Sequence, residues 1–194
     1  MTERRLGELV SVCVIASMLV CMPGSVCAQG QVEREGVFVV GVAGGYAWMN
    51  VAADNRPGNP EGAFAFGIRG GYAITRDVFA GMELNGWTLN TYDMNDPSRG
   101  ESISNVSAVI NYFPMGGPVY FTAGIGKVAY TNNSPAVSGG REQGDSWFVG
   151  GGYEFPISRD LTLAPQIRYV RGDFTGGNFS AYEITLGVNW YLGN

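Results

Sequence analysis

Five charged side chains interrupt segments that are otherwise apolar or rich in glycine: Arg69, Glu83, Glu154, Arg168 and Glu183. Opposite charges in such surroundings are expected to pair, because an uncompensated buried charge is costly. An arginine that exchanges glutamate partners can gate an ion path, and two carboxylates such as Glu83 and Glu154 can in principle catalyse hydrolysis. The same set can also form a polar plug that fixes the register of the segments carrying it.

The composition disfavours enzymatic chemistry. The sequence has no histidine, which removes the commonest general base and the commonest metal ligand. Its three cysteines, Cys13, Cys21 and Cys27, all precede residue 29, so the rest of the chain has no thiol nucleophile and no cysteine metal site. Nothing in the sequence places Glu83 and Glu154 in an accessible cleft. We predict that the protein is not an enzyme and uses no metal or other cofactor.

The charge balance of the chain disfavours a nucleic-acid partner. The chain has 17 acidic and 12 basic residues, a formal net charge of −5, and no basic run. A nucleic-acid partner is therefore not expected, because such binding depends on neutralising phosphates with Lys and Arg.

Residues 1–28 have the features of a secretory signal peptide. Arg4 and Arg5 give a basic start, and residues 10–20 form an apolar run too short to cross a bilayer as a helix. Pro23 and Gly24 end this run, and Ala28 completes a cleavage site of small residues. We predict that this segment is removed on export.

Eight later segments alternate between bulky apolar residues and small or polar ones, and this period of two is typical of β-strands. They cover residues 36–50, 63–74, 78–90, 102–113, 119–129, 147–156, 161–170 and 181–192. Each is near the length, roughly ten residues, with which a tilted strand crosses a bilayer. The sequence thus predicts an all-β protein of eight strands.

The connections between these segments alternate in length. Residues 75–77, 114–118 and 157–160 are short and contain the Pro, Gly and Asp of tight turns. Residues 51–62, 91–101, 130–146 and 171–180 are longer and polar. Such alternation predicts an antiparallel up-and-down barrel, with short turns on one rim and four long loops on the other.

The two faces of each strand indicate which side of the barrel is apolar. In the first strand Phe38, Tyr46 and Trp48 alternate with Gly41 and Gly45. The narrow interior of an eight-stranded barrel has no room for the bulky face, so this face is expected to contact lipid. Strand parity then places the five charges in the lumen, together with Asn85, Asn111 and Gln166. The alternative is a soluble, lipocalin-like barrel with the bulky face inside.

The chain resembles a known family, the small eight-stranded outer-membrane barrels of Gram-negative bacteria (the OmpA transmembrane domain and OmpX-like superfamily). The resemblance is carried by residues 36–48, 151–155, 163–169 and the last strand. In that strand Thr185, Gly187, Trp190 and Leu192 match the signal by which such chains are handed to the barrel assembly machinery. The resemblance implies a cleaved signal peptide 1–28, a short periplasmic segment 29–35 and an outer-membrane barrel 36–194.

This resemblance also frames the expected function. The expected role is structural or surface interaction through the four long extracellular loops, with outer-membrane lipid and lipopolysaccharide as neighbours and an unidentified surface ligand. The alternative is a narrow, low-conductance pore gated by the lumenal Arg/Glu network. Arg171, Gly172 and Asp173 form an integrin-type tripeptide in the fourth long loop, although three residues match by chance often.

Overall fold

The computed structural model describes residues 34–53, 56–89, 101–132 and 141–193. The predicted signal peptide lies outside these residues, as does all of the predicted periplasmic segment except Arg34 and Glu35. Among the described residues, no helix has the length and apolarity needed to cross a membrane.

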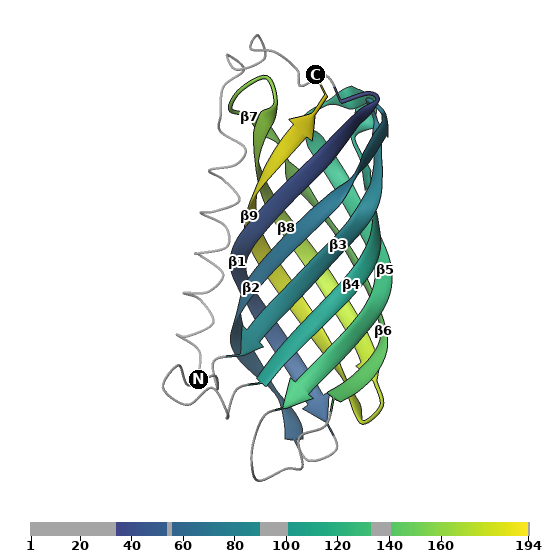
Figure 1. Ribbon diagram of the computed structural model, residues 1–194. Helices are drawn as coiled ribbons and strands as arrows, with labels where there is room; N and C mark the ends of the chain where they lie inside the picture. The colour runs from purple at the N-terminus through teal and green to yellow at the C-terminus, as the bar shows by residue number, and fades with distance from the viewer. Residues whose placement is uncertain (1–33, 54–55, 90–100, 133–140, 194) are drawn as a thin grey trace, which may run out of the picture. The chain divides into compact units, whose positions relative to one another are not determined.

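The described strands form one closed antiparallel sheet (Figure 1). Its elements are β1 (Val37–Ala53), β2 (Arg56–Thr75), β3 (Val78–Leu89), β4 (Glu101–Tyr112), β5 (Val119–Asn132), β6 (Arg141–Tyr153), β7 (Phe155–Pro156), β8 (Leu161–Phe174) and β9 (Gly177–Leu192). Each long strand pairs with its neighbour in sequence, β1 pairs with β9, and β6 pairs with β8 across the short β7. Because β7 is a two-residue piece separated from β6 by Glu154, the barrel has eight long strands, and the predicted fold is confirmed.

The alternation of residue types in the sequence corresponds to alternate side chains that face the lumen and the outer surface. In β4, Val106 and Ile110 are exposed on the outer surface, whereas Asn105, Ser107 and Asn111 are buried in the lumen. The bulky face of β1 is likewise outward, with Phe38 62% exposed and Trp48 51% exposed. The soluble alternative, with this face inside, is therefore wrong.

Aromatic side chains on the outer surface gather toward both ends of the strands. Phe38 and Tyr72 meet edge to face at one end, and Tyr46 and Trp48 at the other. Positions 38 and 48 are ten residues apart along β1, which is about 33 Å of strand and about 25 Å of height at a tilt of about 40°. This height matches the apolar band of a membrane barrel.

The lumen is less uniformly small and polar than the sequence suggests. Large rings also point inward: Phe79, Phe113 and Tyr120 toward the short-turn end, and Trp87, Tyr130, Phe148, Phe174 and Phe179 toward the other end or the middle. Glycines on facing positions make the space. A Cβ on Gly172 would lie 2.3 Å from the ring of Phe179, its partner in the β8–β9 ladder. Because a glycine lies beside an inward ring, the aromatic side chains fill the interior without widening the barrel.

Three predicted tight turns lie at one end, at the upper rim in Figure 1, where β1 begins and β9 ends. Between β2 and β3, Thr75 Oγ1 accepts hydrogen bonds from the backbone N–H groups of Asp77 and Val78, at 3.2 and 3.1 Å. Between β4 and β5, Pro114–Gly116 forms a 3-10 turn in which Met115 and Gly116 have positive φ.

The opposite end differs from the sequence prediction at three of the four long loops. The β1–β2 ladder continues through Val51↔Asn59 to Ala53↔Arg56, and the β8–β9 ladder continues to Phe174↔Gly177. Predicted loops 51–62 and 171–180 are thus largely strand. Their polarity reflects contact with water beyond the apolar band, because a ladder satisfies its backbone whatever its side chains are. Predicted loop 130–146 is also strand on both sides of residues 133–140, because residues 130–132 belong to β5 and residues 141–146 to β6, and Tyr130 pairs with Glu142. Residues 133–140 and 91–100 of the predicted loops lie outside the described residues.

Candidate functional site in the barrel interior

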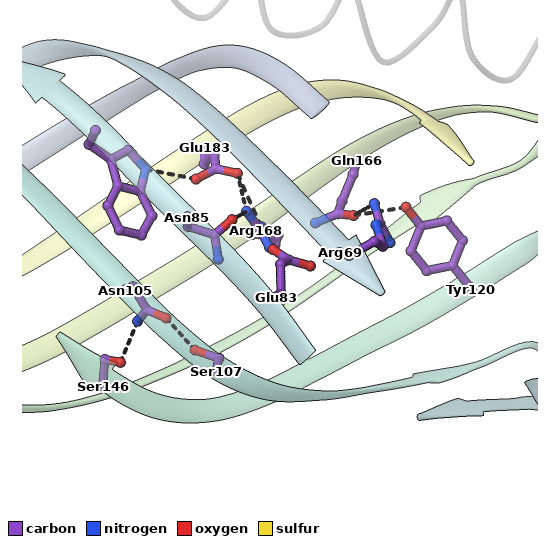
Figure 2. Close-up of polar contacts among 11 residues, drawn as sticks. Arg69, Glu83, Asn85, Asn105, Ser107, Tyr120, Ser146, Gln166, Arg168 and Glu183 are labelled. Carbon is purple, nitrogen blue, oxygen red and sulfur yellow. Dashed lines mark hydrogen bonds and ion pairs between the residues drawn. The ribbon is translucent and has the colours of Figure 1, made fainter. Parts of the chain in front are cut away.

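Arg168 of β8 is the centre of the interior network (Figure 2). Its guanidinium forms ion pairs with Glu83 of β3 and Glu183 of β9, and the Nη2–Oε1 distance to Glu183 is 2.5 Å. Nη2 also donates to Oδ1 of Asn85 at 3.2 Å. All four side chains are buried, with Glu183 only 1% exposed. Charge-assisted bonds of this kind are about twice as strong as neutral ones, so they fix three strands to one another across the lumen.

Two aromatic residues complete the surroundings of this layer. Trp87 Nε1 donates to Oε2 of Glu183 at 2.9 Å, and the Arg168 guanidinium lies over the Phe148 ring, 4.9 Å from its centroid. Both carboxylate oxygens of Glu183 are therefore satisfied. Sequence analysis missed Trp87 and Phe148, although both occupy inward parity positions in their strands.

Arg69 takes different partners from those of Arg168. Its Nη2 donates to Oε1 of Gln166 at 3.2 Å, and the same oxygen accepts from the Tyr120 hydroxyl at 2.9 Å (Figure 2). Arg69 and Glu83 are partners in the β2–β3 ladder. With Arg69 included, the central part of the lumen holds two positive and two negative charges.

Glu154 belongs to a separate cluster at the short-turn end. It lies between β6 and β7 and pairs with Arg34, at 3.0 Å between Nη2 and Oε2. It also accepts hydrogen bonds from Tyr191 at 2.6 Å and from Asn189 Nδ2 at 2.8 Å. Burial lowers the pKa of the Arg34 guanidinium, but Glu154 and Tyr191 outweigh this effect and hold that pKa above its usual value.

Sequence analysis also missed Arg34, the one charged side chain of this cluster that it did not find. Arg34 precedes β1, so no strand alternation marks it. The charge count does carry a signal, because the five predicted residues comprise two arginines and three glutamates. A buried set that lacks one positive charge requires a further cation, and Arg34 supplies it.

The interior leaves little free space between the described residues. Two cavities of about 10 Å³ lie along the lumen, one between Arg34 and Arg69 and one beside Arg69, Glu83 and Arg168. A cavity of this size holds about one water molecule. No cluster of three metal-ligating side chains occurs in the described part of the chain.

The remaining predicted residues lie on two surfaces. In β9 the side chain of Thr185 and the backbone of Gly187 face the lumen, whereas Trp190 and Leu192 face outward and are 58% and 44% exposed. Arg171, Gly172 and Asp173 lie within β8, paired with β9 and with β6. The tripeptide is therefore in a ladder, and its predicted position in a loop is wrong.

A closed sheet with an apolar outer band and a charged interior satisfies every condition for crossing a bilayer with strands, and it defines a transmembrane β-barrel. The family model described as "Outer membrane protein beta-barrel domain" matches residues 16–191. The chain belongs to this family, and its location is the outer membrane.

Solved structures with the same fold support this assignment. Neisserial surface protein A (NspA) is 18% identical with a TM-score of 0.63, covering 80% of this chain and 99% of its own. Ail, the attachment invasion locus protein of Yersinia pestis, in complex with the heparin analogue sucrose octasulfate, is 13% identical with a TM-score of 0.52, covering 80% and 99%. No curated protein sequence matches the chain significantly. At these identities the likeness concerns the fold alone.

Proposed function

We propose that the protein is a non-enzymatic, non-conducting outer-membrane barrel whose role is structural and surface interaction. The observation that carries this proposal is the filled lumen. Arg168 is held by two carboxylates and an amide at once, and the cavities on either side of Arg69 have room for about one water each. A path for hydrated ions would require several of these contacts to break together.

We place the proposed interaction surface at the end of the barrel opposite the short turns. There the sheet β2-β1-β9-β8 continues as a paired ladder, with Val51 opposite Asn59 on one side and Phe179 on the other. A hydrogen-bonded ladder presents side chains at fixed positions, which lowers the entropy lost when a partner binds. Asn50 and Asn178 are exposed on its outer face.

The charges near this end bear on the class of ligand. Lys127 pairs with Asp145 at 2.5 Å, and Arg171 lies 3.9 Å from Asp173. Lys127 and Arg171 therefore each have an acidic neighbour, so these two side chains offer little to a polyanion such as the heparin analogue bound to Ail. We propose a ligand of mixed or no charge. Outer-membrane lipid and lipopolysaccharide remain the proposed neighbours of the outer surface, and the barrel assembly machinery the proposed partner of β9.

Conductance in planar bilayers tests the lumen. The purified protein is expected to give no discrete openings, and Glu183→Gln is expected to give none either. The alternative function, a narrow pore, has one observation in its favour: Arg168 is shared between two glutamates and can release one of them. Openings in the parent protein that change with Glu183→Gln, Arg69→Ala or Glu154→Ala would establish the pore and reject the plug.

Adhesion of bacteria that display the protein tests the surface role. Cells are applied to arrays of host glycans and matrix proteins, and any binding is compared with that of Asn50→Lys/Asn178→Lys. The double variant is expected to lose the binding, whereas Arg159→Ala, in an exposed turn at the opposite end, is expected to keep it. Equal binding by all three would reject the ladder as the interaction surface.

A further inference from the structure

Arg34 lies outside the strands, yet it is as buried as the lumenal charges, at 6% exposed. Its Nε and Nη2 donate to Oε2 of Glu154 at 3.2 and 3.0 Å. Its Nη1 donates to the backbone oxygens of Gly116 and Gly117, each at 3.1 Å. Nε also lies 3.3 Å from the Tyr191 hydroxyl. An arginine in a mere connecting segment would remain in water.

The groups around Arg34 form a receptor for a guanidinium ion. A carboxylate and two carbonyls accept its N–H groups in its plane, and the Phe113 ring lies 4.1 Å from the guanidinium carbon on its face. Glu154 is itself oriented before Arg34 is counted, by Tyr191, by Asn189 and by its own N–H, which donates to Pro118 O at 2.8 Å. The receptor is therefore built by the barrel and occupied by the segment before β1.

The position of this receptor determines what it does. It joins the β4–β5 turn, the break between β6 and β7, and β9. The cavity behind it is lined by Arg34, Thr75 and Val78 toward the rim and by Arg69 toward the centre. Val39 and Ala73 lie in its wall. Arg34 thus closes the end of the lumen that carries the short turns.

We propose that Arg34, three residues before β1, is a latch: its side chain occupies a guanidinium-binding site at the periplasmic mouth, and its release opens the adjoining cavity to the periplasm. This device is independent of the surface role proposed above. It adds a second barrier in series with Arg168, which is separated from it by the layer of Arg69.

Thiol labelling of Val39→Cys tests the latch. The variant is made with Cys13, Cys21 and Cys27 replaced by serine, folded in detergent, and treated with a small cationic methanethiosulfonate. With Arg34 present, labelling is expected to be slow. Arg34→Ala is expected to raise its rate roughly tenfold, since labelling of a closed cavity tracks the population of its open form.

Chemical rescue distinguishes loss of a specific guanidinium-binding site from a general loosening of the barrel in Arg34→Ala. Guanidinium ion at sub-denaturing concentration is expected to slow the labelling of Arg34→Ala, and urea, its neutral analogue, is not. Arg76→Ala is the matched control, because Arg76 is exposed at the same end. Heat-modifiable migration reports that each variant is folded.

Two results would overturn the proposal: equal labelling rates with and without Arg34, or rescue by urea as effective as rescue by guanidinium. If Arg34→Ala does not fold, Arg34→Lys is measured in its place. It keeps the charge but loses the planar fork, so its labelling is expected to be faster than that of the parent and slowed by guanidinium. A rate equal to that of the parent would reject the guanidinium site.

Discussion

The indole N–H of Trp87 and the guanidinium of Arg168 share the Glu183 carboxylate, with Trp87 Nε1 2.9 Å from Oε2 and Arg168 Nη2 2.5 Å from Oε1. Each oxygen thus has its own donor. A fully buried carboxylate needs this arrangement, because an unsatisfied oxygen in a dry interior keeps its full desolvation cost. Trp87 therefore belongs to the charged layer as well as to the apolar packing around it.

Replacing Trp87 with phenylalanine removes this donor and keeps most of the ring. We expect the free energy of unfolding to fall by about 2 kcal/mol, the usual range for a hydrogen bond to a charged group. Urea unfolding of the protein folded into lipid vesicles measures the change. Trp147→Phe is the control, because Trp147 faces outward and is 41% exposed. Equal losses in the two variants would show that the bond to Glu183 contributes nothing.

Arg168→Met leaves Glu83 and Glu183 with one positive charge, Arg69, in the central lumen. We expect a loss of about 3–5 kcal/mol in the free energy of unfolding, because a buried charge then has no partner. Adding Glu183→Gln restores the balance, so the double variant is expected to be more stable than Arg168→Met alone. The same urea titration, applied to both single variants and to the double variant, gives their coupling energy. Additive losses would contradict a shared network.

Strand parity accounts for what the sequence predicted well. A residue in a barrel strand faces either lipid or lumen, so the alternation around Arg69, Glu83 and Arg168 was enough to place all three inside. The partners of these three charges could not be predicted, because parity says nothing about which strands face each other across the lumen. Glu154 was grouped with these charges, yet the break after β6 directs it to Arg34.

The two hairpins beyond the apolar band show a second limit. Residues 51–62 and 171–180 are rich in Gly, Asn, Pro and Asp, which are loop signals in a soluble protein. In a barrel the neighbouring strands already supply a template, and Asp173↔Asn178 pairs as part of the ladder. Local propensity was overridden by tertiary pairing.

Gly172→Ala tests how closely the rings fit the glycines. The new Cβ would lie 2.3 Å from the Phe179 ring, so we expect a loss of about 1–3 kcal/mol from overpacking. Gly70→Ala is the control: Gly70 faces outward and a Cβ there meets nothing within 4 Å. In a Phe179→Leu background the cost of Gly172→Ala is expected to shrink. If Gly70→Ala costs as much as Gly172→Ala, backbone propensity and not the ring explains the loss.

Trp190→Asp separates assembly from stability. Trp190 is 58% exposed and lies near the short-turn end of β9, opposite Val40 of β1. An acidic residue this close to the membrane interface costs only about 1 kcal/mol or less in stability. We therefore expect the variant to fold in detergent micelles with heat-modifiable migration.

In cells the same variant is expected to be depleted from the outer-membrane fraction, because it alters the assembly signal that we propose for Trp190 together with Thr185, Gly187 and Leu192. Trp48→Asp is the matched control. Trp48 is 51% exposed on the outer surface, near the opposite end of the strands. Trp48→Asp thus places the same charge near the other membrane interface, outside the proposed signal in β9. We expect it to reach the outer membrane. If both variants are depleted equally, a charge on the lipid face is sufficient cause and Trp190 carries no assembly signal.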